Sequence, residues 1–388
     1  MNNEKKRIVV GLSGGVDSAT STYLIKKENK DYCISAVFMQ NWDDFLSGNK
    51  VIKRKCTQTQ DWEDASNVSK FLSIDLKKIS FVNEYWDEVF LDFLSKLKRG
   101  ITPNPDILCN SVIKFSRFID YARKDLKADY LVTGHYARII FDENKQSHYL
   151  AKCKDENKDQ TYFLCKINFS ILPYLIFPLS DLKKEEVREI AKNAGLPNFQ
   201  KKDSTGICFV GENNFNNFIS NYLDEKSGDI IDIDSLEILG KHKGAIFFTV
   251  GQRKGLNLGG EKFANYVVGK DIEKNIIYVA KGYENSWLYS DYCFVEDFNW
   301  LLNKWEIKDI ENKNITAKFR HRQKEVEVKV EFLDKEFNKL KIIYKNSIRA
   351  ITPGQFAVLY DGNICLGGGI IISTSKIDYQ SRPLFLNN

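Results

Sequence analysis

The sequence lacks the patterns that mark metal-binding, membrane-spanning and secreted proteins. No two of its eight cysteines form a Cys-x-x-Cys pair or another spacing typical of zinc or iron–sulfur sites. They are Cys33, Cys56, Cys109, Cys153, Cys165, Cys208, Cys293 and Cys365. No apolar run approaches the length of a membrane span, and the short apolar run near the N-terminus cannot serve as a signal peptide. We therefore expect a cytoplasmic protein with reduced thiols, no metal site and no membrane contact.

The sequence also lacks a strong net charge. A formal charge of +5 on 388 residues is too small to indicate a nucleic-acid partner by itself. Two stretches are locally basic: residues 96–127 hold eight Lys or Arg against three Asp, and residues 241–262 hold five against one Glu. A solvated surface explains such stretches equally well, so charge alone leaves the partner open.

The first half of the chain alternates short apolar runs with helical patterns. Strands are expected at residues 7–12, 34–39, 76–81 and 130–133, and helices at 19–27, 61–72, 85–97 and 112–124. A further helix is expected to begin after a cap at Ser180 or Asp181 and to end at Gly195. This alternation predicts an α/β domain with a parallel sheet.

The pattern changes to period two after about residue 225. Short alternating runs occur at residues 276–280, 324–333, 341–344 and 356–360, with glycine-containing turns between them. They predict an all-β region that ends in a small barrel. We expect a catalytic domain at residues 1–205, a small central domain at 206–280 and a C-terminal β-barrel at 281–388.

The strongest local signal lies at residues 8–20, where an apolar strand leads through a glycine-containing turn into a helix. The turn is Ser13, Gly14, Gly15, Val16, Asp17 and Ser18. Glycines let the backbone approach a ligand, and a helix N-terminus attracts anions. The turn is neither a Walker loop, because no Gly-Lys-Ser/Thr follows, nor a GxGxxG dinucleotide turn. We expect it to bind phosphate, and an ordinary strand-to-helix turn is the alternative.

The turn SGGVDS resembles the SGGxDS loop of the N-type ATP pyrophosphatases, the PP-loop superfamily. This resemblance implies an α/β PP-loop domain that cleaves ATP between its α and β phosphates and adenylates a substrate. It also implies that the loop holds pyrophosphate with Mg²⁺ and that adenine lies over the end of the second strand. The implied ATP-binding residues are Gly11, Leu12, Ser13, Gly14, Gly15, Val16, Asp17, Ser18, Met39 and Gly134.

Seven further segments narrow the resemblance to the bacterial tRNA-specific 2-thiouridylase family. Their order and spacing are similar to that family from Gly11 to about Ile371. The segments are TPNPDILCN (102–110), TGHY (133–136), NKDQTYFL (157–164), KKDSTGICFVGE (201–212), TVGQRKGL (249–256), TPGQFAV (352–358) and CLGGGII (365–371).

Two cysteines lie in these segments. Cys109 follows two prolines and precedes a helix expected to start near Val112, so its thiol would be biased toward thiolate. Cys208 lies close in sequence to Lys202 and Gly206. Taken singly, each would more often be an inert buried thiol. The resemblance implies that Cys208 carries a persulfide and that Cys109 is the nucleophile or resolving thiol.

The same resemblance implies a general acid or base and a set of tRNA contacts. Asp106 would face the target base and exchange protons with it. The implied tRNA-binding residues are Asn104, Pro105, Asp106, His135, Lys158, Asp159, Gln160, Arg320, His321 and Gln355. His321 departs from the family pattern, which commonly has tyrosine there, but either ring can stack on a base.

The implied reaction is ATP-dependent formation of 2-thiouridine at the wobble position of tRNA. ATP with Mg²⁺ would be the co-substrate, without a tightly bound cofactor, and sulfur would come from a sulfur-relay protein or a cysteine desulfurase. The tRNAs implied have Lys, Glu and Gln anticodons, and the base must leave the anticodon stack to react. The two basic stretches are candidate surfaces for the tRNA backbone.

Two other functions remain to be distinguished. Another ATP-dependent ligase of the same fold would need neither Cys109 nor Cys208 and would not respond to tRNA. A non-catalytic tRNA-binding or sulfur-carrier protein would not need an intact phosphate loop, so exchange of ATP with pyrophosphate would separate it from an enzyme. The sequence leaves open whether sulfur attacks from the persulfide or as hydrosulfide, and it does not indicate an oligomeric state.

Overall fold

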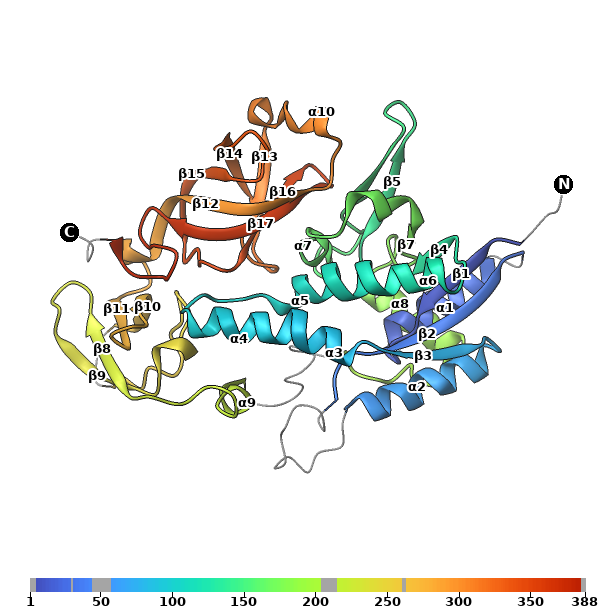
Figure 1. Ribbon diagram of the computed structural model, residues 1–388, viewed down its shortest axis with the longest axis horizontal. Helices are drawn as coiled ribbons and strands as arrows, with labels where there is room; N and C mark the ends of the chain where they lie inside the picture. The colour runs from blue at the N-terminus through green and yellow to red at the C-terminus, as the bar shows by residue number, and fades with distance from the viewer. Residues whose placement is uncertain (1–4, 29–30, 44–56, 204–214, 260–262, 385–388) are drawn as a thin grey trace. The chain divides into compact units, whose positions relative to one another are not determined.

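A computed structural model describes residues 5–28, 31–43, 57–203, 215–259 and 263–384 (Figure 1). The chain divides into two compact units that are described separately below. Unit 1 comprises residues 1–89, 106–213 and 363–365, and unit 2 comprises residues 90–105, 214–362 and 366–388. The expected division into three domains at residues 205 and 280 stays a prediction.

Unit 1 is built on a five-stranded parallel sheet with the order β3-β2-β1-β4-β7. The strands are β1 (Arg7–Gly11), β2 (Cys33–Gln40), β3 (Leu76–Ser80), β4 (Tyr130–Val132) and β7 (Leu175–Ile176). Ile8, Val9 and Val10 of the central strand are all buried. A continuous apolar run of this kind is typical of a strand covered on both faces, and the expected parallel sheet is confirmed.

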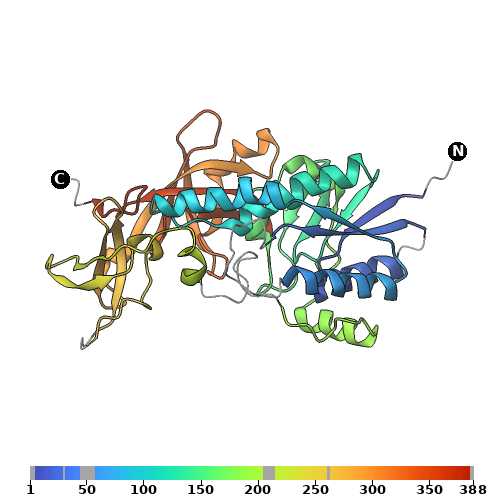
Figure 2. The ribbon, with the colours of Figure 1, turned by 60° about the horizontal axis from the view of Figure 1, so that its bottom comes forward.

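Helices cover both faces of this sheet. Helices α1 (Val16–Glu28), α2 (Thr57–Phe71) and α8 (Lys184–Asn193) share one apolar cluster with β2, which includes Val16, Phe38, Val68 and Ala191. Figures 1 and 2 show α2 and α6 (Ile119–Lys124) on opposite faces of the sheet. The packing brings the start of α8 toward α1, although the two helices are far apart in sequence.

The helix expected at residues 112–124 begins earlier than predicted, at Pro105. It runs through α5 (Pro105–Leu108), a π-helical segment η2 (Cys109–Phe118) and then α6. Proline favours the first helical position, because its ring presets φ and its missing N–H would be unpaired there anyway. Cys109 therefore lies inside the helical run, and the expectation that it precedes the helix is wrong.

The start of α8 also differs from the prediction, because its N-cap is Lys183 rather than Ser180 or Asp181. The backbone N–H of Lys183 donates to Glu186 Oε2 at 2.7 Å, and the N–H of Lys184 donates to Asp155 Oδ2 at 2.9 Å. These two carboxylates satisfy backbone donors that the first turn leaves open. As expected, the chain leaves the helix through Gly195, which has a positive φ of 70°.

The remaining elements of unit 1 are short. The hairpin of β5 (Arg138–Asp142) and β6 (Ser147–Ala151) follows β4, and Ile364 pairs with Ala151 at its edge. Helix α3 (Val82–Tyr85) begins the helical run expected at residues 85–97, which continues as η1 (Trp86–Phe90) and as α4 (Leu91–Lys98) of unit 2. Two short helical segments follow β6, α7 (Thr161–Leu164) and η3 (Phe169–Tyr174).

Unit 2 contains the predicted β structure in two sheets. The first has the order β10-β11-β8-β9, with β8 (Gly228–Asp232), β9 (Ile238–His242), β10 (Asn265–Asp271) and β11 (Ile276–Lys281). The second contains β12 (Tyr289–Trp300), β13 (Ile315–Lys318), β14 (Val326–Phe332), β15 (Leu340–Arg349), β16 (Phe356–Asp361) and β17 (Ile364–Thr374). Strand β12 pairs with both β15 and β17, which closes a six-stranded barrel and confirms that prediction.

The alternation that predicted the barrel strands reflects burial on one face. In β14, Val328 and Val330 are buried, whereas Glu327, Lys329 and Glu331 between and beside them are exposed. Side chains on a strand point alternately to its two faces, so period two follows from a buried interior and a solvated exterior. Within the ranges described above, no helix has the length and apolar character needed to cross a membrane.

Candidate active site

The phosphate loop of unit 1 is closed by two serines. The backbone N–H of Ser13 donates to Ser18 Oγ at 3.1 Å, the two hydroxyl oxygens lie 3.1 Å apart, and Ser18 Oγ donates to the carbonyl of Gly15 at 3.0 Å. These contacts bend the chain from the end of β1 directly into α1. The N-terminus of a 13-residue helix, with its unpaired N–H groups, therefore faces the turn.

Two glycines allow the chain to come this close. Gly14 has a φ of +79°, and a Cβ built there would lie 2.2 Å from the carbonyl oxygen of Asp61. A Cβ on Gly134 would lie 2.7 Å from the backbone nitrogen of Ser18. Both neighbours are backbone atoms that cannot give way, so these positions require glycine.

The expected ATP residues gather at one edge of the sheet. Strands β2 and β4 flank β1, and Met39 lies near the end of β2 while Gly134 follows β4. Because the three strands are parallel, their carboxyl ends and the phosphate loop meet at the same edge. Ligands of open α/β sheets bind at this edge, which agrees with the arrangement expected for Gly11, Leu12 and the turn residues.

The carbonyl of Gly14 is held from the far side of the loop. Asn198 Nδ2 donates to it at 2.9 Å and Lys201 Nζ at 3.3 Å. Lys201 also forms ion pairs with Asp61 at 2.6 Å and Asp64 at 2.5 Å. Burial lowers the pKa of Lys201, but the hydrogen bonds that its ammonium donates to the two carboxylates outweigh this effect and raise the pKa above its ordinary value. Lys201 is thus a fixed positive charge behind the loop.

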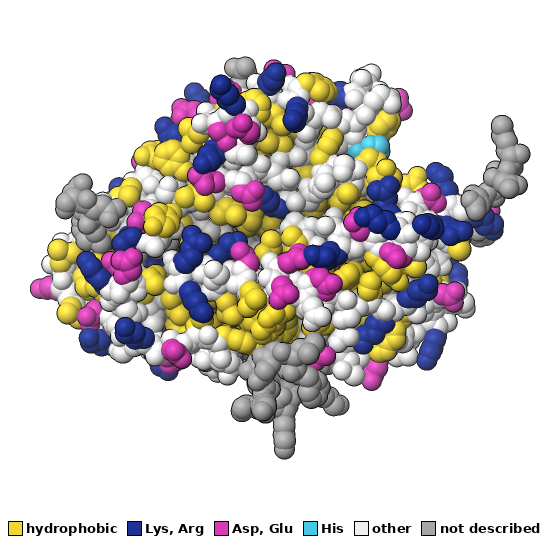
Figure 3. Space-filling model, viewed as in Figure 1, with side chains coloured by type: hydrophobic (Ala, Val, Ile, Leu, Met, Phe, Trp, Pro, Cys, Tyr) yellow, Lys and Arg dark blue, Asp and Glu magenta, His cyan; other side chains and the backbone are white. Residues whose placement is uncertain are grey.

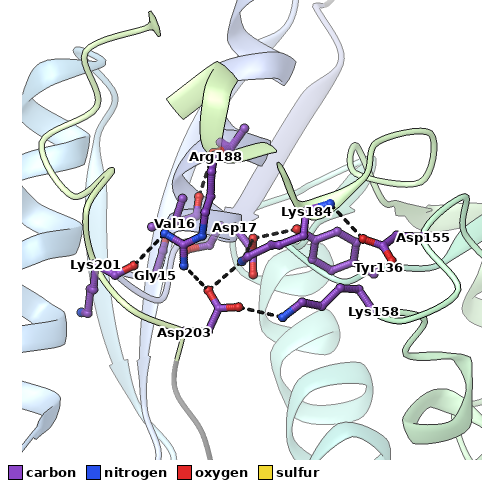
Figure 4. Close-up of polar contacts among 12 residues, drawn as sticks. Gly15, Val16, Asp17, Tyr136, Asp155, Lys158, Lys184, Arg188, Lys201 and Asp203 are labelled. Carbon is purple, nitrogen blue, oxygen red and sulfur yellow. Dashed lines mark hydrogen bonds and ion pairs between the residues drawn. The ribbon is translucent and has the colours of Figure 1, made fainter. Parts of the chain in front are cut away.

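Asp17, at the first turn of α1, joins a polar cluster that Figure 4 shows in full. Tyr136 donates its hydroxyl to Asp17 Oδ1 at 2.9 Å, and Lys184 Nζ lies 2.6 Å from the same oxygen. Lys184 also pairs with Asp203 at 2.8 Å. Burial and the Asp17 carboxylate raise the pKa of Tyr136, so this phenol stays protonated and acts as a donor.

Asp203 forms ion pairs with three cationic side chains. Its Oδ1 pairs with Lys184 at 2.8 Å and with Arg188 at 2.6 Å, and its Oδ2 pairs with Lys158 at 2.8 Å. Burial raises the pKa of Asp203, but the hydrogen bonds from Lys158 and Lys184 outweigh it and lower the pKa from 3.8 to about 2. We call Lys158, Lys184, Arg188 and Asp203 the α8 charge cluster.

The sequence analysis did not predict four charged residues of this site, namely Lys184, Arg188, Lys201 and Asp203. Lys184 and Asp17 are separated by 167 positions in the chain. Lys184 and Arg188 lie four residues apart and so share one face of α8. That spacing is the only sequence signal for the pair, and it is also typical of ordinary solvated helices.

The expected tRNA-binding residues 158–160 have partners inside unit 1. Asp159 is 3% exposed and accepts hydrogen bonds from the backbone N–H groups of Cys153 and Thr161. Gln160 Oε1 accepts from the N–H of Tyr136 at 2.9 Å. These contacts give Asp159 and Gln160 a structural role in the turn that precedes α7. Lys158 is the residue of the three that reaches the α8 charge cluster.

His135 lies between aromatic rings. Its Nδ1 is 2.8 Å from Thr133 Oγ1, and its ring packs against Phe115 and Phe177. Burial and the nearby charge of Lys114 hold the pKa of His135 well below its ordinary value. The imidazole is therefore neutral at neutral pH.

Two of the three expected catalytic residues, Asp106 and Cys109, lie in the described part of the chain. Asp106 is half-buried in α5, and Cys109, at the first position of η2, is only 3% exposed. The Asn104-Pro105 dipeptide leads into this segment at the point where unit 2 passes to unit 1. Cys208 lies outside the described residues.

The other expected tRNA contacts lie in unit 2. Arg320 donates to the carbonyls of Val250 and Ala350 and to the hydroxyl of Thr352. Gln355 Nε2 donates to the carbonyls of Thr102 at 3.0 Å and Pro103 at 3.3 Å. Gln355 thus fixes the backbone just before Asn104. His321 follows Arg320 in the turn after β13 and is partly exposed.

The cysteines in the described ranges form no disulfide with one another; they are Cys33, Cys109, Cys153, Cys165, Cys293 and Cys365. In the part of the chain that the structure describes, no three His, Cys, Asp or Glu side chains come together as a metal site.

The sequence matches three protein families in succession. They are the tRNA methyl transferase HUP domain at residues 6–212, the tRNA methyl transferase PRC-barrel domain at residues 216–281 and the aminomethyltransferase beta-barrel domain at residues 290–371. Among solved structures, the U34-tRNA thiolase NcsA from Methanococcus maripaludis covers 50% of this chain and 59% of its own, at 19% identity and a TM-score of 0.33. A likeness of that size supports no conclusion here.

Curated relatives match over nearly the whole chain. The tRNA-specific 2-thiouridylase MnmA of Mesoplasma florum is 47% identical over 95% of this chain and 99% of its own. The protein of the same name from Pediococcus pentosaceus is 46% identical over 95% of this chain and 96% of its own. The one from Mycoplasma capricolum is 45% identical over 96% of this chain and all of its own. The chain therefore belongs to the tRNA-specific 2-thiouridylase family, and it is a tRNA sulfurtransferase.

Proposed function

We propose that the enzyme activates the wobble uridine of tRNA with ATP and then replaces O2 of that base with persulfide sulfur. The observation that carries this proposal is the phosphate loop, in which two serines and two required glycines set the N-terminus of α1 beside ordered cations. Such an arrangement suits a polyphosphate far better than a neutral ligand. We assign Gly11, Leu12, Ser13–Ser18, Met39 and Gly134 to ATP.

Asp17 suits a magnesium ion that accompanies the nucleotide. Its contacts to Tyr136 and Lys184 both use Oδ1, which leaves Oδ2 directed elsewhere. Mg²⁺ in nucleotide sites is commonly held by one or two carboxylates together with phosphate oxygens. When bound, the ion would neutralise phosphate charge. Tyr136 and Lys184 would keep the carboxylate oriented for it.

The first chemical step is adenylation. O2 of the uridine attacks the α-phosphorus of ATP, and the bond to the bridging oxygen breaks, releasing diphosphate. Charge develops on the phosphate oxygens in this step, and fixed donors stabilise it without reorganising. Adenylation makes O2 a good leaving group at C2. Asp106 is proposed to accept and return the proton of the base.

The second step transfers sulfur. The terminal sulfur of a persulfide on Cys208 attacks C2, and O2 leaves with AMP. The thiolate of Cys109 then attacks the Cys208 sulfur, so that the sulfur–sulfur bond breaks, a Cys109–Cys208 disulfide forms and sulfur remains on C2. A thiol reductant must restore both thiols before the next turnover. Cys109 is buried, so solvent has little access to its sulfur.

We propose that tRNA is held by the residues expected from the family resemblance and by the two basic stretches. The contacts would be Asn104, Pro105, Asp106, His135, Lys158, Asp159, Gln160, Arg320, His321 and Gln355. Buried Asp159 and the backbone-bound Gln355 would act by holding their segments in place. The substrates would be tRNAs with Lys, Glu and Gln anticodons, and the donor a sulfur-relay protein or cysteine desulfurase. The absence of disulfides among the described cysteines fits the cytoplasm.

The experiment that tests this proposal combines two products of one reaction. Unmodified tRNA is incubated with the protein, ATP with Mg²⁺ and a persulfide source. Nucleosides are then analysed by mass spectrometry and diphosphate release is measured. We expect 2-thiouridine and diphosphate from the wild type. We expect neither from Asp17→Asn or Ser18→Ala, because both residues shape the anion-binding turn.

The matched control for this experiment is Asp181→Asn, since Asp181 pairs with Arg138 outside the cluster. It should retain both products. Wild-type diphosphate release by both loop variants would refute the assignment of the loop. Diphosphate release that requires no tRNA would favour the alternative of a ligase for small molecules.

A further inference from the structure

Lys184 is a cation held in place by two carboxylates. Its side chain is 8% exposed, and its Nζ lies 2.6 Å from Asp17 of the phosphate loop and 2.8 Å from Asp203. A lysine this well buried and paired has little freedom to turn toward solvent. Figure 4 shows it pointing from α8 to the start of α1. Its charge is therefore fixed beside the loop that we assign to phosphate.

Arg188 extends the same positive surface by one helical turn. It shares a face of α8 with Lys184, and its guanidinium pairs with Asp203 at 2.6 Å and donates to the carbonyl of Lys201 at 3.2 Å. Arginine forks match phosphate and carboxylate oxygens equally well. Two partners near the end of the described range 57–203, the Asp203 carboxylate and the Lys201 carbonyl, thus orient the Arg188 side chain.

Asp203 is the acceptor on which these cations converge. It binds Lys158, Lys184 and Arg188 with two oxygens, while its side chain remains 31% exposed. Exposed ion pairs contribute little stability individually. Three donors converging on one partly exposed carboxylate, next to an anion-binding turn, form the kind of donor set that takes a phosphate group.

We propose that Lys184 and Arg188 bind the phosphates of ATP and that the Asp203 carboxylate competes with the nucleotide for these two cations. The inference rests on the proposed use of ATP and adds to it binding residues outside the loop. The α8 charge cluster together with Asp17 has three cations and two carboxylates, a net charge of one positive unit. A phosphate oxygen that replaces Asp203 keeps each donor paired.

Competition by Asp203 has a consequence opposite to that of an ordinary structural ion pair. If an ion pair positions a binding residue, removal of either partner leaves that residue less well positioned and weakens ligand binding. An internal competitor, in contrast, lowers the affinity for the ligand, so its removal strengthens binding. Asp203→Asn therefore distinguishes the two roles: it should weaken ATP binding if Asp203 is a structural partner and strengthen it if Asp203 is a competitor.

The test measures direct binding to the full-length protein by titration calorimetry. The probes are ATP with Mg²⁺, inorganic pyrophosphate and adenosine, and the variants are Asp203→Asn and Lys184→Gln. We expect Asp203→Asn to bind ATP and pyrophosphate about 5- to 10-fold more tightly, a change of the size usual for one charge contact. We expect Lys184→Gln to bind both at least about 10-fold more weakly. Adenosine, which carries no phosphate, should bind all variants alike.

Asp181→Asn is the matched control, because it removes the same charge from a pair with Arg138, and circular dichroism checks folding. If Asp203→Asn is not folded, Asp203→Ser carries the same expectation. Unchanged or weaker ATP binding by a folded Asp203 variant would overturn the competition. Unchanged ATP binding by Lys184→Gln would overturn the phosphate contact. A wild type that binds no ATP would instead overturn the proposed function.

Discussion

Lys270 is a charged side chain placed in the interior of unit 2. It lies on β10, is 1% exposed, and donates from Nζ to the carbonyl of Phe248 at 2.8 Å. Burial lowers its pKa from 10.5 to about 7. Each pKa unit corresponds to about 1.4 kcal/mol, so the protonated amine destabilises the folded state relative to the unfolded state by on the order of 5 kcal/mol. A buried base of this kind couples folding to pH.

We predict that unit 2 becomes more stable as pH rises from about 7 to about 10. Over that window the unfolded chain holds a proton that folded Lys270 has released, and stability rises wherever the unfolded state binds more protons. Below about pH 7 Lys270 is protonated in both the folded and the unfolded state, and the buried charge destabilises the folded state to its full extent. Lys270→Met should therefore raise the urea midpoint most at pH 6, and progressively less toward pH 10.

The measurement is urea unfolding followed by tyrosine and tryptophan fluorescence at several pH values. Lys274→Met, an exposed lysine in the turn after β10, serves as the control and should follow the wild type. Parallel pH profiles for the wild type and Lys270→Met would contradict the prediction, because they would mean that Lys270 does not titrate differently in the two states.

At the scale of elements, the helical run from Pro105 to Lys124 carries Asp106 and Cys109, two of the proposed catalytic residues. Because it begins at Pro105, Cys109 lies at the fifth helical position and at the start of a π-helical segment. The influence of the helix dipole falls off within the first turn, so this position gives the thiol less help than a true N-terminus. Segments of π-helix are frequent at functional sites, and here one begins at the cysteine assigned to sulfur transfer.

We predict that the two cysteines can be separated by their products. Cys208→Ser should still adenylate tRNA, because the phosphate loop is intact, but should carry no persulfide and form no 2-thiouridine. Cys109→Ser should accept sulfur on Cys208 but fail to complete or repeat the transfer, because no second thiol forms the disulfide. Labelled sulfur on the protein, AMP and 2-thiouridine are measured over many turnovers.

Cys33→Ser is the control for these variants, since Cys33 is exposed at the start of β2 and belongs to none of the motif segments. It should retain wild-type turnover. Labelled sulfur trapped on Cys109 instead of Cys208 would reverse the two roles. Full multiple-turnover activity in either single variant would exclude a mechanism that uses both cysteines.

At the scale of the whole molecule, the net charge is small. On the face shown in Figure 3, Lys and Arg side chains are intermingled with Asp and Glu, which agrees with a net charge of only +5. The chain also passes five times between the units, at residues 89/90, 105/106, 213/214, 362/363 and 365/366. Single cuts in the sequence cannot separate the units, so tRNA binding is better tested with surface substitutions.

We predict that the basic stretch at residues 241–262 contributes to tRNA binding through phosphates. Arg253 and Lys254 are both exposed. The double variant Arg253→Glu/Lys254→Glu should weaken tRNA binding at low salt and reduce the slope of log Kd against log salt by about one for each lost phosphate contact. Filter binding of unmodified tRNA at several salt concentrations measures both quantities.

Lys308→Glu/Lys335→Glu is the matched double variant, because it makes the same charge change at exposed positions outside both basic stretches. It should lower affinity less and leave the slope nearer that of the wild type. Equal losses in the two double variants would show that only overall charge matters. No loss in either would remove this stretch from the tRNA surface.

The sequence by itself determined the architecture and the loop. Apolar runs and period-two alternation follow directly from which faces are buried, so the parallel sheet, the barrel and the strand–turn–helix at Ser13–Ser18 were predictable and are confirmed. The motif order likewise indicated the family that the relatives establish. Boundaries such as Pro105 and Lys183 were missed, because cap and first-turn signals compete over several residues.

Only the tertiary structure decided which distant side chains meet. Lys184 and Asp203 carry no local pattern that links them to Asp17, because their contact arises from the packing of α8 against α1. The same holds for Gly134, whose need for glycine depends on the approach of Ser18, and for Lys270, whose pKa depends on burial. Local sequence encodes backbone preference, whereas the charge environment of a residue depends on neighbours that only the folded chain supplies.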